Sequence, residues 1–177
     1  MKKTNMTRFA KTALQVSKQS KRPIIYHSRE GQHIIACSYF FIRTSNEDTF
    51  RAILGKIPES KVIPDKQTAD GVVAILDQTD KLWELTNTGI VAEEQYGFRR
   101  FLMAEDFVVT INDDFLYIFD GDYVSLSGRG PNAPVIVTGH DYTAGILPLR
   151  HRSNEAALAT MHRLIGRSGW QPIREEA

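Results

Sequence analysis

Four aspartates in one short stretch are the densest group of potential metal ligands in the sequence: Asp113, Asp114, Asp120 and Asp122. Carboxylate oxygens bind Mg²⁺ and Ca²⁺, so a metal-dependent hydrolase is one chemistry that this group could serve. A metal site needs oxygens that converge, whereas Asp113 and Asp114 would diverge by about 100° on a helix. The loop that follows also lacks the ligand spacing of a calcium site. We therefore interpret these aspartates as capping and solubilising residues and keep the hydrolase as a minor alternative.

Histidine, cysteine and glycine patterns do not indicate catalysis either. The five histidines include no close i, i+4 pair and no zinc-ligand spacing. Cys37 lies among apolar residues, where a thiolate is disfavoured. The stretch Gly128-Arg129-Gly130-Pro131 precedes an expected strand and has no Lys-Ser/Thr pair after it, so we expect a turn rather than a phosphate-binding loop. The sequence therefore predicts a non-enzymatic protein with no catalytic residue, no metal and no cofactor.

Positive charge is concentrated at the N-terminal end of the sequence. Residues 1–22 contain no carboxylate, and the cations Arg8, Lys11, Lys18 and Arg22 fall within about 80° of arc on an ideal helix. The opposite side of that helix is apolar and carries Met6, Phe9, Ala10, Ala13 and Val16. Such a basic stripe is either a solvated outer face or a surface that contacts DNA phosphates. In the second case the partner is double-stranded DNA, bound without sequence specificity.

The elements that would position this stripe begin with a helix at residues 8–19, capped by Thr7 and ended by Pro23. Residues 23–27 and 33–42 are expected to form two strands, because they are rich in β-branched and aromatic residues and are joined around Glu30-Gly31. Residues 44–68 are polar and contain two prolines. We expect them to leave the sheet as an irregular excursion with one helical fragment at 48–54.

The second half of the chain repeats the order of a helix followed by strands. Strands are expected at residues 71–77, at 82–85 and 89–93 as a hairpin around Asn87, and at 107–111; residues 99–103 are a strand or a helix start. Asn112 is the expected N-cap of a helix at 113–119. Strands at 123–127, 134–137 and 144–147 follow, the last two as a hairpin around the turn at 138–141, and Gly166 ends a last helix at 155–165.

Length and composition favour a soluble, single-domain protein. The chain has 177 residues, of which 42% are hydrophobic and 24% charged, as in ordinary globular domains. No apolar run is long enough to span a membrane, and the single cysteine suits a reducing compartment, so we expect a cytoplasmic location. The expected organisation is one α+β domain at residues 1–150, built from two helix-plus-antiparallel-strand halves, with an appended C-terminal helix and tail at 151–177.

Several stretches resemble the sliding clamp of bacterial DNA polymerase, the ring-forming processivity subunit. Arg22-Pro23-Ile24-Ile25-Tyr26, followed by Ile34-Ile35-Ala36-Cys37-Ser38, resembles the strand pair after the first clamp helix. Residues 58–64 are similar to a linker of the clamp, and residues 123–137 and 145–150 are similar to its final strands. The resemblance covers about residues 8–150. Ser38-Tyr39-Phe40 stands where the clamp has its Thr-Asp signature, and this chain continues beyond the closing Arg150.

The resemblance implies a non-enzymatic, DNA-associated, clamp-like protein, such as a replication accessory of a phage or mobile element. A clamp chain contains three such domains and this chain has room for one, so the resemblance also implies assembly into a homo-oligomer. We expect that assembly to use free sheet edges or the C-terminal helix, whose residues Leu158, Met161 and Ile165 would need a partner surface. The alternative is a protein-interaction module that keeps the fold, engages replication proteins and does not encircle DNA.

Overall fold

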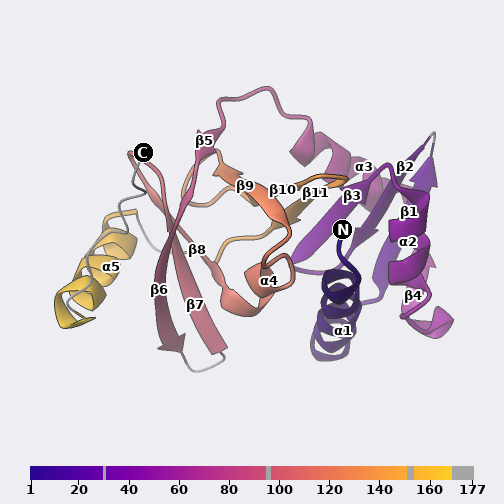
Figure 1. Cartoon of the computed structure of the whole chain (residues 1–177), viewed down its shortest axis with the longest axis horizontal. Helices are drawn as coiled ribbons and strands as arrows, with labels where there is room; N and C mark the ends of the chain where they lie inside the picture. The colour runs from indigo at the N-terminus through magenta and orange to yellow at the C-terminus, as the bar shows by residue number, and fades with distance from the viewer. Residues whose placement is uncertain (30, 95–96, 151–153, 169–177) are drawn as a thin grey trace.

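Two β-sheets organise the computed structural model, which describes residues 1–29, 31–94, 97–150 and 154–168 (Figure 1). The larger sheet has eight strands in the order β4-β1-β2-β3-β11-β10-β9-β5, and the smaller has three in the order β6-β7-β8. All strand pairs are antiparallel except the pair of β1 with β4. The structure is therefore an α+β fold, as the sequence predicts.

The large sheet is built from two similar halves. Helix α1 (Lys3–Ser20) precedes β1 (Ile24–Arg29), β2 (Gln32–Ala36) and β3 (Phe40–Thr44). Helix α4 (Asp113–Tyr117) precedes β9 (Tyr123–Gly128), β10 (Val135–Gly139) and β11 (Tyr142–Ile146). The two meanders join where β3 pairs with β11, with Ile42 opposite Ala144. This arrangement confirms the predicted repeat of a helix followed by antiparallel strands.

Both of these helices pack on the same face of the large sheet. The Phe9 ring of α1 lies 5.0 Å from that of Phe40 and 6.5 Å from that of Phe119, measured between ring centroids. The Phe115 ring of α4 lies 5.1 Å from the same Phe40 ring. Burying large aromatic side chains is among the strongest contributions to a core, so this cluster holds α1 and α4 against the sheet.

Helix α1 has the predicted amphipathic character but different ends. Its buried positions include Phe9, Ala10, Ala13 and Val16, the apolar side expected from the sequence. The helix begins at Lys3 rather than near residue 8 and ends at Ser20. Lys21 follows in the left-handed conformation, with φ 57°. Arg22 therefore lies beyond the helix, and its predicted place in a helical stripe is wrong.

Residues 71–76 form the second half of a helix, not the strand predicted at 71–77. Helix α3 (Lys66–Leu76) begins at Asp65, whose side chain accepts hydrogen bonds from the backbone N–H groups of Gln67 and Thr68. Its residues Ala69 and Val72 pack on the other face of the sheet, in a cluster with Ile34, Ala36 and Phe41. An N-cap and one-sided burial outweigh the strand preference of Val72 and Val73.

Residues 44–68 contribute to the core and to the edge of the large sheet, so their prediction as an excursion outside both is wrong, but the helical fragment predicted at 48–54 is confirmed. Helix α2 (Glu47–Leu54) contributes Phe50 and Ile53 to the main cluster, and Ile57 joins them. A short 3₁₀ helix, η1 (Glu59–Lys61), leads into β4 (Val62–Pro64), which pairs with β1 at the edge of the large sheet. Pro64 is tolerated there because an edge strand can lack one donor.

Two further strand predictions change in the structure. Residues 33–42 are not one strand, because the chain turns between β2 and β3, where the Cys37 amide donates to the Phe40 carbonyl at 2.9 Å. Residues 82–93 are not a hairpin, because β5 (Trp83–Glu84) pairs with β9 in the large sheet. Strand β6 (Thr86–Glu94) instead pairs with β7 (Gly97–Met103), which pairs with β8 (Val108–Asn112). Residues 99–103 are thus a strand.

The last helix, α5 (Asn154–Ser168), covers the small sheet, at one end of the molecule (Figure 1). Ala157 and Met161 pack against Ile90, Phe101 and Val108 in a second core. The apolar face that the sequence leaves in need of a partner is therefore covered within the chain at Met161 and partly at Leu158. The side chain of Ile165 and the predicted tail at 169–177 lie outside the described residues. None of the described helices combines the length and apolar character of a membrane span.

Candidate nucleic-acid interface and neighbouring pocket

Exposed cations gather along the outward side and the C-terminal end of α1. Lys11 and Lys18 are exposed on the helix, and Lys21 and Arg22 are exposed directly after it. None of these side chains forms an ion pair or a hydrogen bond with a described residue. The negative end of the helix dipole favours cations at a C-terminus, which explains part of this arrangement without any ligand. We call Lys11, Lys18, Lys21 and Arg22 the basic face.

Arg8, the fourth residue of the predicted stripe, is not part of this basic face. Its guanidinium carbon lies 4.0 Å from the centroid of the Tyr117 ring, and its Nη1 donates to the Tyr117 carbonyl at 3.2 Å. Arg8 therefore connects α1 to the end of α4. Of the four predicted residues, Lys11, Lys18 and Arg22 are exposed to solvent, whereas the Arg8 side chain is bonded to Tyr117.

The acidic residues of and after α4 have structural partners. Asp113 forms an ion pair with Arg100 of β7, and Asp122 accepts a hydrogen bond from the Lys2 amide at 3.0 Å. Asn112 caps the helix, as predicted, by accepting from the Asp114 amide at 2.9 Å. Among the described residues, no three His, Cys, Asp or Glu side chains are close enough together to hold a metal ion. Asp114 and Asp120 remain exposed, and Asp120 lies beside α1, because its carbonyl accepts from Asn5 Nδ2 at 3.0 Å.

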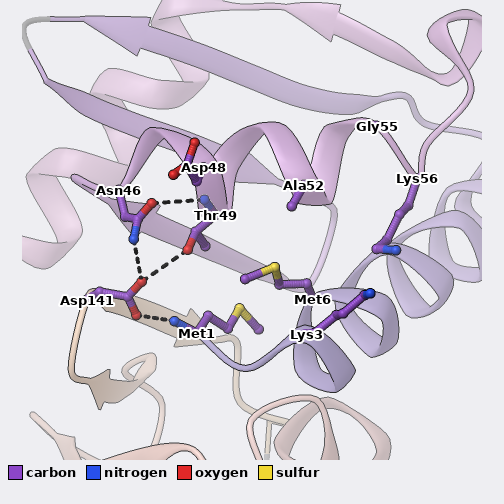
Figure 2. A pocket seen from close by; sticks show the side chains of 10 residues that line it. All are labelled: Met1, Lys3, Met6, Asn46, Asp48, Thr49, Ala52, Gly55, Lys56 and Asp141. Atoms are coloured by element: carbon purple, nitrogen blue, oxygen red, sulfur yellow. Dashed lines mark hydrogen bonds and ion pairs between the residues drawn. The ribbon is translucent and has the colours of Figure 1, made fainter.

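A pocket of about 580 Å³ lies between α1 and α2 (Figure 2). Its apolar part is formed by Met1, Met6 and Ala52. Asn46, Asp48, Thr49 and Asp141 lie at one end of it, and Lys3, Gly55 and Lys56 lie at the other. The pocket therefore has a carboxylate end and an ammonium end, separated by thioether and methyl groups.

Asp141 makes the carboxylate end rigid. It forms an ion pair with the Met1 ammonium, and its Oδ2 accepts from Thr49 Oγ1 at 3.0 Å and from Asn46 Nδ2 at 3.3 Å. The Asp141 carbonyl also accepts from Thr44 Oγ1 at 2.7 Å. Partial burial alone would raise the pKa of Asp141, but the hydrogen bonds from the ammonium and Thr49 outweigh it and hold that pKa below its ordinary value. The Asp141 carboxylate is therefore bonded within the protein, whereas Asp48 at the same end is exposed.

The ammonium end has no such internal partners. The Lys3 and Lys56 side chains are exposed, and neither forms an ion pair or a hydrogen bond with a described residue. Their ammonium groups extend towards the same end of the pocket in Figure 2. Lys56 lies just beyond the C-terminus of α2, where the helix dipole favours it, whereas Lys3 lies in the first turn of α1, where the dipole disfavours a cation.

Sequence reasoning did not identify this pocket, because its residues come from three distant segments. The sequence contains only a local signal for this region, because Asn46 followed by Glu47 and Asp48 is typical of the start of a helix. In the structure Asn46 accepts a hydrogen bond from the Thr49 amide at 3.0 Å. Nothing in the sequence indicates that the β10–β11 turn would bring Asp141 to that cap.

Comparisons of the chain with known protein families, with curated proteins and with solved structures gave no significant match. The class of protein is therefore defined by its own architecture, an α+β fold of two helix-plus-meander halves that share one sheet.

Proposed function

We propose that this chain is a non-enzymatic, clamp-like protein that binds duplex DNA without sequence specificity through the basic face of α1. The observation that supports it best is the set of exposed cations without internal partners, Lys11, Lys18, Lys21 and Arg22. The sequence places no carboxylate among residues 1–29 to neutralise them. Surface cations without internal partners, two on α1 and two directly after it, suit a polyanion whose phosphates are regularly spaced.

The chemistry of these side chains favours phosphate contacts over reading of bases. Three of them are lysines, whose ammonium groups act as mobile point charges rather than planar, bidentate donors. Contacts to the phosphates carry no sequence information. Four neutralised phosphates predict a slope of about −3.6 in log K against log salt, which weakens binding about 150-fold between 50 and 200 mM salt.

Assembly into a homo-oligomer is part of this proposal. The outer strands β4 and β5 leave sheet edges uncovered by a further strand among the described residues, and Ile63 on β4 is 44% exposed. Pairing of such edges between copies would continue the sheet from one subunit to the next. Light scattering at high micromolar concentration should give a mass of a dimer or larger, and a strictly monomeric mass would contradict this part.

The decisive experiment compares two sets of charge reversals. The variant Lys11→Glu, Lys18→Glu, Arg22→Glu should lose binding to a mixed-sequence duplex at low salt, because it reverses three charges of the basic face. The matched control Arg51→Glu, Lys61→Glu, Lys66→Glu makes the same change in net charge at exposed positions on α2, η1 and α3. The control should keep most of the affinity and the steep dependence on salt. Equal binding by both variants would refute the proposal.

The alternative is a protein-interaction module that does not encircle DNA. It is favoured by the exposed acidic residue Asp120 beside α1 and by two exposed aromatic side chains, Tyr39 (48%) and Tyr117 (55%). Acidic groups repel a duplex, and exposed aromatic residues are frequent at protein interfaces. If the charge reversal leaves duplex binding unchanged, this alternative replaces the DNA-binding function, and replication proteins become the partners to test.

A further inference from the structure

The pocket between α1 and α2 has the properties of a binding site for a ligand with two unlike ends. Its volume of about 580 Å³ falls within the range of small-molecule sites. Met1, Met6 and Ala52 supply an apolar surface, and the two methionines are flexible enough to adapt to different shapes. These features are separate from the basic face, because Lys11 and Lys18 do not line the pocket.

The two ends of the pocket differ in what they can offer a ligand. The Asp141 carboxylate already accepts from Thr49 and Asn46 and pairs with the Met1 ammonium, so Asp141 itself has little capacity left for a cation. At the other end Lys3 and Lys56 have no partner among the described residues. In Figure 2 their side chains extend towards the same end of the pocket, while Asp48 lies at the opposite end of α2.

We propose that this pocket binds a small amphipathic anion, a carboxylate carried on a short alkyl or aryl body. Lys3 of α1 and Lys56, just after α2, hold the carboxylate from opposite sides, since charge-assisted hydrogen bonds from two ammonium groups are stronger than neutral ones. The body of the ligand lies over Met6 and Ala52, where its apolar surface is removed from water.

The four methionines of the chain provide an internal test of location. Met1 and Met6 line the pocket, whereas Met103 and Met161 pack in the separate core beside the small sheet. In a protein labelled with ¹³C at the methionine methyl groups, titration with octanoate should shift the Met1 and Met6 resonances and saturate. The Met103 and Met161 resonances should not move. The titration is kept below the concentration at which octanoate forms micelles.

Matched probes separate the contributions of head and body. Acetate carries the carboxylate without the body, and 1-octanol carries the body without the charge, so each should bind at least about tenfold more weakly than octanoate if both ends are recognised. Equal affinity for octanol and octanoate, or a shift of all four methyl resonances, would overturn the proposal, because it would indicate unspecific apolar binding.

Two variants complete the test. Lys3→Gln with Lys56→Gln should weaken octanoate binding at least about tenfold, whereas the control Lys61→Gln with Lys66→Gln, which removes the same charge elsewhere, should not. Ala52→Trp should abolish binding by filling the space, with unchanged Met103 and Met161 resonances as evidence that the protein stays folded. Unaltered octanoate affinity in either pocket variant would refute the site. Both outcomes are independent of DNA binding, which is measured in parallel.

Discussion

Replacing Lys21 by glycine should make the protein more stable and weaken its binding to DNA. Lys21 follows the last residue of α1 with φ 57° and ψ 27°, a left-handed conformation that glycine adopts without strain. Lysine in this conformation destabilises the folded state by about 1–2 kcal/mol. The greater conformational freedom of glycine in the unfolded chain reduces the expected gain from Lys21→Gly by about 0.5–1 kcal/mol. The expected net gain is thus about 1 kcal/mol, or a rise in Tm of about 2–4 °C for a chain of this size.

The matched control for this prediction is Lys21→Ala. Alanine removes the same charge but keeps the side chain that is strained at positive φ, so it should not raise the Tm. Because both variants remove one cation from the basic face, both should reduce the salt slope of DNA binding by about 0.9. Thermal unfolding and titrations of a duplex at three salt concentrations measure the two effects. A Tm increase as large with alanine as with glycine would refute the strain argument, and an unchanged slope would remove Lys21 from the interface.

The remaining predictions concern a thiol, a carboxylate and a glycine. Burial raises the pKa of the Cys37 thiol to about 11. At pH 8 native Cys37 should therefore react with iodoacetamide about two orders of magnitude more slowly than Cys37 in the unfolded chain. Equal reaction rates in the two states would contradict this prediction. The pKa of Asp141 is lower in the folded state than in the unfolded chain. The contribution of the Asp141 carboxylate to stability is therefore complete above the ordinary aspartate pKa of about 3.9, and it is lost as the pH falls through the pKa of the folded state. Asp141→Asn should therefore lower the free energy of unfolding at pH 7. This variant should also lose less stability than the parent as the pH falls, as measured by urea unfolding between pH 2 and 7. A Cβ on Gly145 would lie 2.1 Å from Cζ of Phe41, so Gly145→Ala should destabilise the protein by about 1–3 kcal/mol. Adding Phe41→Leu should recover part of this lost stability. If Phe41→Leu recovers none of it, the Phe41 ring is not the obstacle.

Local signals in the sequence predicted much of the fold, because many elements are set by residues close together in the chain. The apolar side of α1 and the Asn112 cap of α4 follow from helical spacing and capping chemistry. The β10–β11 hairpin follows from two apolar runs around a turn. These features are consistent with the long-range packing, so local and tertiary preferences agree.

The errors fall where tertiary contacts decide. Residues 71–77 resemble a strand in composition, but a helix is formed because Asp65 caps it and Val72 finds an apolar surface on β2 and β3. Residues 82–93 resemble a hairpin, but the chain crosses from one sheet to the other at Leu85. The contact of Arg8 with Tyr117 joins positions 109 residues apart, which helical spacing within α1 cannot indicate.

The geometry of α1 explains why one helix can serve separate purposes. Successive residues advance by about 100°, so the side that carries Lys3 and Met6 faces α2, Arg8 faces α4, and Lys11 and Lys18 face solvent. The buried side, with Phe9 and Ala13, fixes these directions against the sheet. A substitution on one exposed side therefore alters one set of contacts and leaves the others in place. For this reason the loss of DNA binding by Lys11→Glu and Lys18→Glu should leave octanoate binding intact, and the loss of octanoate binding by Lys56→Gln should leave the salt slope of DNA binding intact.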